Sequence, residues 1–426
     1  MAASSPGRRL VGKVGIGVAI GLLATGVALG LARLEFVHNN ELRAYDWRMR
    51  LTARPSAPSR DVVIVAMNDD SIRRLEPVVG RWPWPRLVHS AVVDFLARGG
   101  AKLIVYDGLF TERDIRRFSV NDEEWTGEES DLAFVESVSK AGNVVLGADA
   151  ADEGLVDATR QVPVALDGIA ALQQTYDASG CGEPRPILLP PFLELAGVAR
   201  AIGHTYTIID GDGPVRRTVP FVEVRNRNVP SLALAAVTAA VGHPAARVAL
   251  IRERVPTADG TTVTACRAMI PYRGPPVNAQ GNASFREFSF YTLFRSEQQI
   301  LEGQQPELDP GVFAGRIVVI GATASGTHDI FTSPFGLVTP GAEIHAHVIE
   351  ALLHDRTITP LDATRGALVV FAAAVAVGVS MVFGSVSATA LLAAAIGALV
   401  TWSSVRLFAD GLWMPLVPAL TAVVLA

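Results

Sequence analysis

Three stretches of the chain are long, strongly apolar and free of charged residues. They cover residues 14–32, 366–405 and 411–426. Because about 20 helical residues cross a bilayer core of about 30 Å, the first stretch predicts one membrane span and the second predicts two. The third is expected to be a further span, shorter than the core is thick. The expected spans are residues 14–33, 366–384, 386–405 and 411–426, with a hairpin at Phe383-Gly384-Ser385.

The charges beside the first stretch predict how the chain crosses the membrane. Arg8, Arg9 and Lys13 precede it, and the positive-inside rule therefore places residues 1–13 in the cytoplasm. Residues 34–365 are then extracytoplasmic, as in a multi-pass protein of a bacterial inner membrane. A cleaved signal peptide is the alternative, but this apolar core is longer than that of a signal peptide, and no convincing small-residue cleavage site follows it.

Four short runs within the outer segment share one hydrophobic pattern. Each is continuous, rich in β-branched residues and followed by small or acidic residues, as in strands buried on both faces of a parallel sheet. The runs are 61–69 (DVVIVAMND), 102–108 (KLIVYDG), 143–149 (NVVLGAD) and 316–323 (RIVVIGAT). We expect the first and last runs in one sheet, so that residues 34–365 fold as a single compact unit.

The segments between these runs predict helices and a hairpin. An apolar stripe from Leu87 to Leu96 has helical spacing and stops at Gly99-Gly100, and the resulting βαβ unit makes the fold class α/β. The segment 203–228 alternates around a turn-rich DGDGP and predicts an antiparallel hairpin, with a helix following in PSLALAAVTAAVG. We therefore expect a mostly parallel sheet with added antiparallel strands, flanked by transmembrane helices.

Composition narrows the classes of function. Hydrophobic residues make up 50% of the chain, which suits a membrane protein, while the net charge of -5 and the pI near 5.9 argue against a nucleic-acid partner. Cys181 and Cys266 are the only cysteines. One disulfide between them is compatible with an oxidising compartment, and the sequence leaves its formation open.

No motif predicts catalysis, a metal or a cofactor. In GATASGT (321–327), Thr327 stands where a phosphate-binding loop has its lysine, which leaves a plain turn or a glycine-rich turn with free amides toward a small anion. DGDGP is too short for an EF-hand calcium loop, and a simple turn is expected. On a helix, His345 and His347 point apart, so they lack zinc-pair spacing and are expected to cap or pack. The pair His328-Asp329 has no placed nucleophile beside it.

Eight motifs in a fixed order closely resemble those of the type-two CHASE domain. That domain is the extracytoplasmic sensory module of bacterial adenylate cyclases, diguanylate cyclases, histidine kinases and serine/threonine kinases. The motifs are RAYDWRMRL, VVIVAMND, GRWPWPR, AKLIVYDGLFTERD, GHTYTIIDGDGPVRR, IPYRG, RIVVIGAT and FGLVTPGAEIHAHVIEALL. The resemblance covers about residues 35–360, and an N-terminal anchor with three later spans is also the family's layout. Two departures, Gly108 and the acidic insert NDEEWTGEESD at 121–131, affect the loop after the second strand.

The resemblance implies a receptor, and it implies no particular ligand. Open parallel sheets bind ligands beyond the carboxyl ends of their strands. In this chain those ends supply Asn68, Asp69, Asp107 and residues 321–323. Strand-end turn chemistry is the alternative role for them. The candidate ligand-binding residues are Asp69, Trp82, Arg86, Asp107, His204, Thr323, His328 and Glu343.

The stretch VGRWPWPR (79–86) is predicted to lie at the same edge, between the first strand and the first helix. Its prolines hold it extended and suit the start of a helix. Alternation places Trp82 and Trp84 on opposite sides, so one tryptophan is expected against the sheet and the other at the rim.

The arginines of this stretch are candidates for a charge contact. Arg81 or Arg86 is expected to pair with Asp69 or Asp107, or to meet an anionic ligand. A structural clamp is the favoured interpretation of the two.

Two functions from different classes fit these features. The first is a membrane-anchored sensor that passes a signal from an unidentified small ligand or envelope signal to a cytoplasmic output domain, expected to be a nucleotidyl (adenylate) cyclase or, second, a kinase. The second is an envelope substrate-binding or assembly protein without an output domain. The sensor is favoured, because the last apolar stretch runs from outside to inside and is expected to continue into the cytoplasm. Sequence beyond Ala426 separates the two.

A homodimer is the expected oligomer. Cyclase-type active sites and kinase pairs assemble between two chains, and Gly17-x-x-x-Gly21 and Gly26-x-x-x-Gly30 in the first span permit close helix approach. The alternative is that glycine is simply frequent in membrane helices.

Overall fold

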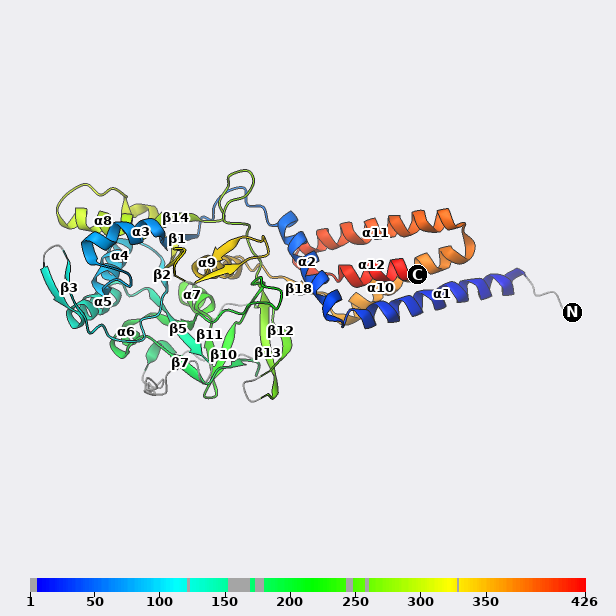
Figure 1. Ribbon diagram of the computed structural model, residues 1–426, viewed down its shortest axis with the longest axis horizontal. Helices are drawn as coiled ribbons and strands as arrows, with labels where there is room; N and C mark the ends of the chain where they lie inside the picture. Colours follow the sequence, from blue (N-terminus) through cyan, green and yellow to red (C-terminus); the bar gives the residue numbers. More distant parts are fainter. Residues whose placement is uncertain are drawn as a thin grey trace. The chain divides into compact units, whose positions relative to one another are not determined.

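The computed structural model describes residues 6–120, 123–151, 169–172, 180–242, 248–256, 260–327 and 329–426. The chain divides into two compact units. One, the α/β unit, is Pro55–Thr357, and the other, the helical unit, joins Met1–Arg54 to Ile358–Ala426 (Figure 1).

Strands and helices mix along the α/β unit. Its described helices are α3 (Asp69–Val79), α4 (Arg86–Arg98), α5 (Gly127–Ala141), α6 (Leu193–Val198), α7 (Leu232–Val241), α8 (Phe290–Leu301) and α9 (Gly341–Leu353), with short 3-10 turns η3 (Ala170–Leu172) and η4 (Pro310–Phe313). Its described strands are β1 (Val62–Met67), β2 (Leu103–Asp107), β3 (Arg117–Val120), β4 (Glu123–Thr126), β5 (Val144–Ala151), β6 (Glu183–Pro184), β7 (Ile187–Leu189), β8 (Ala201–His204), β9 (Arg217–Thr218), β10 (Phe221–Val224), β11 (Arg227–Pro230), β12 (Ile251–Pro256), β13 (Thr262–Met269), β14 (Arg286–Ser289), β15 (Ile317–Ala322), β16 (Ile330–Thr332) and β17 (Val338–Pro340).

A mostly parallel sheet forms the centre of the α/β unit. Its strand order is β14-β1-β15-β2-β5-β7, with β8 also paired to β5. All of these pairs are parallel except β5 with β7. The four predicted runs are all in this sheet, and β1 lies beside β15 in the register Val62↔Ile317 to Met67↔Ala322. The predicted fold class and the shared sheet of the first and last runs are confirmed.

Helices cover both faces of this sheet. α3, α4, α5 and α8 pack together on one face, and α7 and α9 pack on the other (Figure 1). The predicted stripe on α4 buries Val88, Val92 and Phe95 completely. Burial from both sides explains why β1 is apolar along its whole length. Each Å² of apolar surface removed from water stabilises the fold by roughly 25 cal/mol.

α3 is a helix that the hydrophobic pattern did not predict. Its N-cap is Asn68, whose side chain accepts a hydrogen bond from the Ser71 amide at 2.9 Å. Only Ser71, Leu75 and Val79 of this helix are buried, so its apolar stripe is too thin to stand out in the sequence. The stretch 79–86 therefore lies between two helices, and not directly after β1.

The hairpin predicted around DGDGP is wrong in its strands. Its first arm, β8, pairs with β5 in parallel. The two predicted arms are joined by the isolated antiparallel bridge Thr207↔Thr218 and form no continuous ladder around the turn. The antiparallel hairpin of this region is β10 with β11, whose turn residues Arg225 and Asn226 have φ of 49° and 63°. Two adjacent left-handed residues give the tight turn that matches the strand twist. The helix predicted after it is α7, and this prediction is confirmed.

DGDGP itself is a turn whose carboxylates are taken by arginines. The Gly213 amide donates to the Asp210 carbonyl at 2.8 Å. The fully buried guanidinium of Arg216 donates to the carboxylates of Asp210 and Asp212 at 2.9 and 2.7 Å. The simple turn that the sequence predicts is confirmed.

The helical unit contains the apolar stretches. Its elements are α1 (Pro6–Leu31), α2 (Glu35–Thr52), β18 (Thr359–Pro360), α10 (Ala363–Phe383), α11 (Val386–Ala409), β19 (Leu412–Trp413) and α12 (Leu416–Leu425). By length and composition, Leu10–Leu31, α10 and α11 can each cross a membrane. The predicted hairpin between α10 and α11 is confirmed, with Ser385 capping α11. The last helix begins at Leu416 and not at 411, because residues 412–413 form β19 and pair with β18. With 10 residues it is not among these three candidate spans, so the predicted fourth span is not supported.

The first glycine pair of α1 packs inside the same chain. A Cβ atom on Gly17 or Gly21 would lie 2.6 Å from the Cα atom of Val379 or Val375 of α10, so both glycines are needed for this close contact. Gly26 and Gly30 have nothing within 4 Å of such an atom. Only the second pair is therefore open to a contact with another chain.

α2 belongs to the helical unit, although the sequence grouped it with residues 34–365. Its Arg48 is fully buried and donates to Glu41 at 2.6 Å, to Ser404 of α11 at 2.6 Å and to the Met414 carbonyl at 2.7 Å. Glu41 also accepts from the amides of Leu416 and Val417 at 3.0 and 2.8 Å. The buried pair is thus fully hydrogen-bonded, and its carboxylate caps the first turn of α12.

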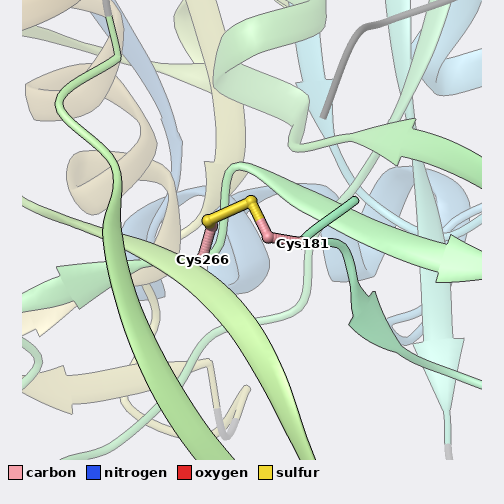
Figure 2. Close-up of a disulfide and its surroundings, with 2 residues drawn as sticks. All are labelled: Cys181 and Cys266. Atoms are coloured by element: carbon pink, nitrogen blue, oxygen red, sulfur yellow. A yellow bond between two sulfur atoms is a disulfide. The ribbon is translucent and has the colours of Figure 1, made fainter. Parts of the chain in front are cut away.

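Cys181 and Cys266 form a disulfide, which resolves the question that the sequence left open. Figure 2 shows the bond joining β13 to the segment just before β6. The Cys266 amide also donates to the Cys181 carbonyl at 2.7 Å. The bond closes a loop with a sequence separation of 85 residues.

We predict that replacing both cysteines by serine lowers the free energy of unfolding by about 2–5 kcal/mol, because the open loop gains conformational entropy when the chain unfolds. Urea unfolding of the full chain in detergent measures it. The parent protein with a reductant is the control and should match the double variant, which should itself be insensitive to reductant. Equal stability of parent and variant without reductant would contradict the prediction.

Candidate ligand-binding site

A cavity of about 520 Å³ opens at the carboxyl edge of the parallel sheet. The last residues of β1, β2 and β15, which are Met67, Asp107 and Ala322, line it. Thr205 follows β8, and Gly341 begins α9, and both are also in its lining. The cavity lies at the sheet edge where the sequence predicts ligand binding.

Two tryptophans from the stretch 79–86 form one side of the cavity. Trp84 is buried and its ring stacks on that of Phe290 at the start of α8, with centroids 5.1 Å apart. Trp82 is 36% exposed and meets Trp84 edge-to-face, with centroids 4.7 Å apart. The prediction of one buried tryptophan and one at the rim is confirmed, although the buried ring packs on a helix. The Trp82–Pro83 peptide bond is cis.

His89 and Tyr106 form the inner aromatic wall, and the sequence did not single them out. The Nδ1 atom of His89 is hydrogen-bonded to the Tyr106 hydroxyl, and both rings lie edge-to-face against Phe110. Burial lowers the pKa of His89 to about 3 and raises the pKa of Tyr106 well above its usual range. Both groups are therefore neutral at physiological pH. Their positions on the buried stripes of α4 and β2 resemble those of plain core residues, which hid them.

Two carboxyl groups and a histidine lie at the polar end of the cavity. The Nε2 atom of His345 is 3.8 Å from an oxygen of Asp107, and Asp329 also lines the cavity. Burial raises the pKa of Asp107 to about 7 and that of Asp329 to about 6, with the charge of Asp107 adding to the second shift. Burial lowers the pKa of His345 to about 4. The histidine is thus neutral at pH 7 and does not compensate either carboxylate.

Asp329 lies against the first residue of α9. A Cβ atom on Gly341 would be 2.6 Å from both oxygens of the Asp329 carboxylate, so only glycine leaves room for this approach. The Gly341 amide also donates to the backbone carbonyl of Asp329 at 3.1 Å. The positive end of the helix dipole therefore already faces a carboxylate of the chain itself.

Arg86 is held by acidic residues other than those predicted. Its guanidinium lies 3.4 Å from the carboxylates of both Asp114 and Asp131, and it donates to the Glu112 carbonyl at 2.7 Å. Arg81 is exposed and pairs with Glu76. Pairing with Asp69 or Asp107 was the wrong prediction. Asp131 is the last residue of the acidic insert at 121–131. The segment that departs from the family's motifs therefore supplies one of the two carboxylates that hold Arg86.

The other candidate residues are used in the fold around the cavity. Asp69 is exposed and accepts from the Ser325 amide and hydroxyl at 3.2 and 3.0 Å. The Thr323 and Ala324 amides donate to the Met67 carbonyl, so the turn at 321–327 does not present them to an anion. That alternative is wrong for these amides.

The histidine and glutamate candidates lie in the interior or outside the described residues. His204 is fully buried in β8, and burial lowers its pKa to about 3. Glu343 is buried, and its carboxylate is 3.7 Å from Nε2 of His347. His328 lies outside the described residues. Of the predicted set, Trp82, Arg86 and Asp107 line the cavity. Asp329 and His345 also line it, and they were not among the predicted ligand-binding residues.

Metal-ligand chemistry gathers at one place in the described part of the chain. Ligand atoms of Asp61, Glu350 and His354 all lie within 4.8 Å of one another. The Glu350 carboxylate already accepts hydrogen bonds from the Arg273 guanidinium at 2.8 Å and from the Ser59 hydroxyl at 2.6 Å. These contacts hold the start of β1 against the end of α9. His345 and His347 face different neighbours, as expected.

Comparison with known proteins adds a family match. A family model of the CHASE2 domain matches residues 19–385, which is most of the chain. No curated protein and no solved structure matches it.

We predict that Arg86→Gln lowers the free energy of unfolding by about 2–4 kcal/mol at pH 8, because Asp131 is left without a cation while Asp114 keeps Arg116. Burial already raises the pKa of Asp131, and losing Arg86 raises it further. A raised carboxyl pKa in the folded state costs stability above that pKa, so the deficit should shrink as the pH falls toward 5. Arg81→Gln is the matched control and should change stability by less than about 0.5 kcal/mol.

Urea unfolding of the three proteins at pH 5 and pH 8 provides the measurement. An Arg86→Gln deficit that does not depend on pH would show that Asp131 is not the group left unpaired.

Proposed function

The chain belongs to the CHASE2 domain family, and we propose that it is a membrane-anchored sensor that passes an extracytoplasmic signal to a cytoplasmic output domain. The observation that carries the proposal is the family match over residues 19–385. Apolar helices on both sides of the α/β unit, α1 before it and α10 and α11 after it, suit such a sensor. The cavity at the sheet edge is then the place where the signal binds.

The α/β unit is proposed to lie outside the cytoplasm of a bacterial inner membrane. Arg8, Arg9 and Lys13 precede the first span, and positive charge favours the cytoplasmic side. The disulfide between Cys181 and Cys266 supports the same side, since such bonds persist in oxidising compartments.

The contacts of Glu41 suggest how a signal would pass along the helical unit. Glu41 on α2 binds the first two amides of α12, and its partner Arg48 binds Ser404 on α11. A displacement of α2 therefore moves the start of α12 with it. We propose that α12 leads to a nucleotidyl (adenylate) cyclase, with a kinase as the second choice.

A homodimer is proposed to form through α1, because cyclase active sites and kinase pairs assemble between chains. Gly26 and Gly30 supply the open surface, whereas Gly17 and Gly21 are covered by α10.

We predict that single cysteines at positions 26 and 30, in a cysteine-free background, form disulfide-linked dimers in membranes under mild oxidation. Cysteines at positions 24 and 28, where Ala24 and Ala28 are buried inside the helical unit, are the matched controls and should cross-link at least about tenfold less. Equal cross-linking at all four positions would contradict this contact.

A second experiment tests coupling to an output. We predict that Glu41→Gln, in the chain fused after Ala426 to a bacterial adenylate cyclase catalytic domain, changes cyclic AMP production by about fivefold or more, since coupling free energies of 1–3 kcal/mol are typical. The exposed Glu35→Gln on the same helix is the control and should have no effect.

Equal membrane levels of the fusions, measured by immunoblot, separate coupling from loss of protein. Cysteine labelling that placed the α/β unit in the cytoplasm would overturn the sensor proposal. A gene that ends at Ala426 would instead favour an envelope binding protein without an output domain.

A further inference from the structure

The cavity presents acidic groups that have no cation of their own. The Asp107 side chain is only 8% exposed, and its Oδ2 atom is buried without a hydrogen-bond partner among the described residues. Asp329 lines the same space, and the histidine beside both carboxylates is neutral. A buried carboxylate without a partner costs several kcal/mol, so it is expected where a ligand supplies the missing charge.

The charged groups around the cavity do not cancel this acidity. Arg86 is the cation in the described lining, and its charge is shared by Asp114 and Asp131. The other titratable groups that face the space, His89, Tyr106 and His345, are neutral. His204, behind His345, is neutral as well. The balance among the described groups is therefore negative.

An anion has no obvious place in this cavity. The first turn of α9 points its amides toward the site, but the Asp329 carboxylate lies against Gly341 and occupies that position. An anionic ligand would be repelled by Asp107 and Asp329. It could pair with Arg86 only by displacing Asp114 and Asp131.

The apolar wall favours an organic cation over a metal ion. Trp82, Tyr106 and Phe110 line the space, and the faces of such rings attract an ammonium group. The ring of Phe110 already attracts one cation, because the guanidinium of Arg86 lies over it at 6.0 Å from its centroid. Among the described residues, the group whose ligand atoms approach one another closely enough for a metal is at Asp61, elsewhere in the unit.

We propose that this cavity binds a small organic cation, with its ammonium group at the carboxylates of Asp107 and Asp329 and its apolar part along Trp82 and Phe110. The inference names the class of signal for the proposed sensor and rests on that proposal for its biological meaning. Binding of the cation itself does not depend on any output domain.

The protonation of the carboxyl groups predicts the pH dependence of binding. Because burial raises the pKa of Asp107 to about 7, this group is largely neutral at pH 6 and ionised at pH 8. The affinity for a cation should therefore rise with pH, by about tenfold between pH 6 and pH 8 from this group alone. Ionisation of Asp329 adds in the same direction.

The experiment is calorimetric titration of the full chain in detergent at pH 8. The probes are 2-phenylethylamine, choline and putrescine, with 3-phenylpropionate as an anion of matched size. We expect at least one cation to bind and the anion not to bind. Asp107→Asn should weaken binding at least about 30-fold, whereas Glu136→Gln, which removes an exposed carboxylate of α5, should leave it unchanged.

A thermal unfolding scan of each variant keeps the test decisive. Replacing an uncompensated buried carboxylate with an amide should leave stability unchanged or raise it, so loss of binding in a folded Asp107→Asn protein supports the site. If Asp107→Asn does not fold, Asp329→Asn and the pH profile give the same test.

The inference is overturned if no probe cation binds, if the anion binds more tightly, or if binding survives both substitutions. A cation that binds without changing the output of the cyclase fusion would refute the sensor proposal and leave the binding site standing. If Glu41→Gln changes the output of the fusion while no cation binds, the sensor proposal stands and the proposed cation site is refuted.

Discussion

The parallel pairing of β1 with β15 is the constraint on which the α/β unit depends. It joins the strands of the central sheet that come first and last in the sequence, in unbroken register over Val62–Met67. The elements between them must therefore loop out and return, and among these the helices α4 and α7 cover the two faces of the sheet. Because β1, β15 and β2 are parallel neighbours, their carboxyl ends meet at one edge. The cavity is a direct consequence of that topology.

Features set by local pattern were predictable from the sequence, and features set by distant partners were not. The buried strands, α4 and the exposed and buried members of the Trp82 and Trp84 pair follow from hydrophobic pattern and proline geometry. α3 was missed because its stripe is thin, and β8 was misassigned because its partner is β5. The cavity lies at the edge where ligand binding was predicted, and the predicted residue Asp107 lines it. Asp329 reaches the site only because Gly341 leaves room, a contact that no sequence spacing shows.

The two units treat buried charge in opposite ways. In the helical unit, Arg48 and Glu41 neutralise each other. Arg48 also donates to the Ser404 hydroxyl and the Met414 carbonyl, and Glu41 also accepts from the amides of Leu416 and Val417. In the α/β unit, Asp107 has neither a cation nor a full set of hydrogen bonds among the described residues. A satisfied pair holds one arrangement of helices, while an unsatisfied buried carboxylate raises the free energy of the folded unit. Strain of the second kind is tolerated where a ligand relieves it.

The small pairing of β18 with β19 has a mechanical consequence. Backbone hydrogen bonds of 2.8 Å join Thr359 to Gly411 and Leu361 to Trp413, at the two ends of the α10–α11 hairpin. In the proposed sensor, force on the chain at Ile358, where it re-enters the helical unit, would therefore reach the start of α12 through this pairing as well as through α10 and α11. The two long helices could tilt to match the thickness of the lipid without breaking that shorter connection. The pairing would then set how stiffly motion is passed to α12.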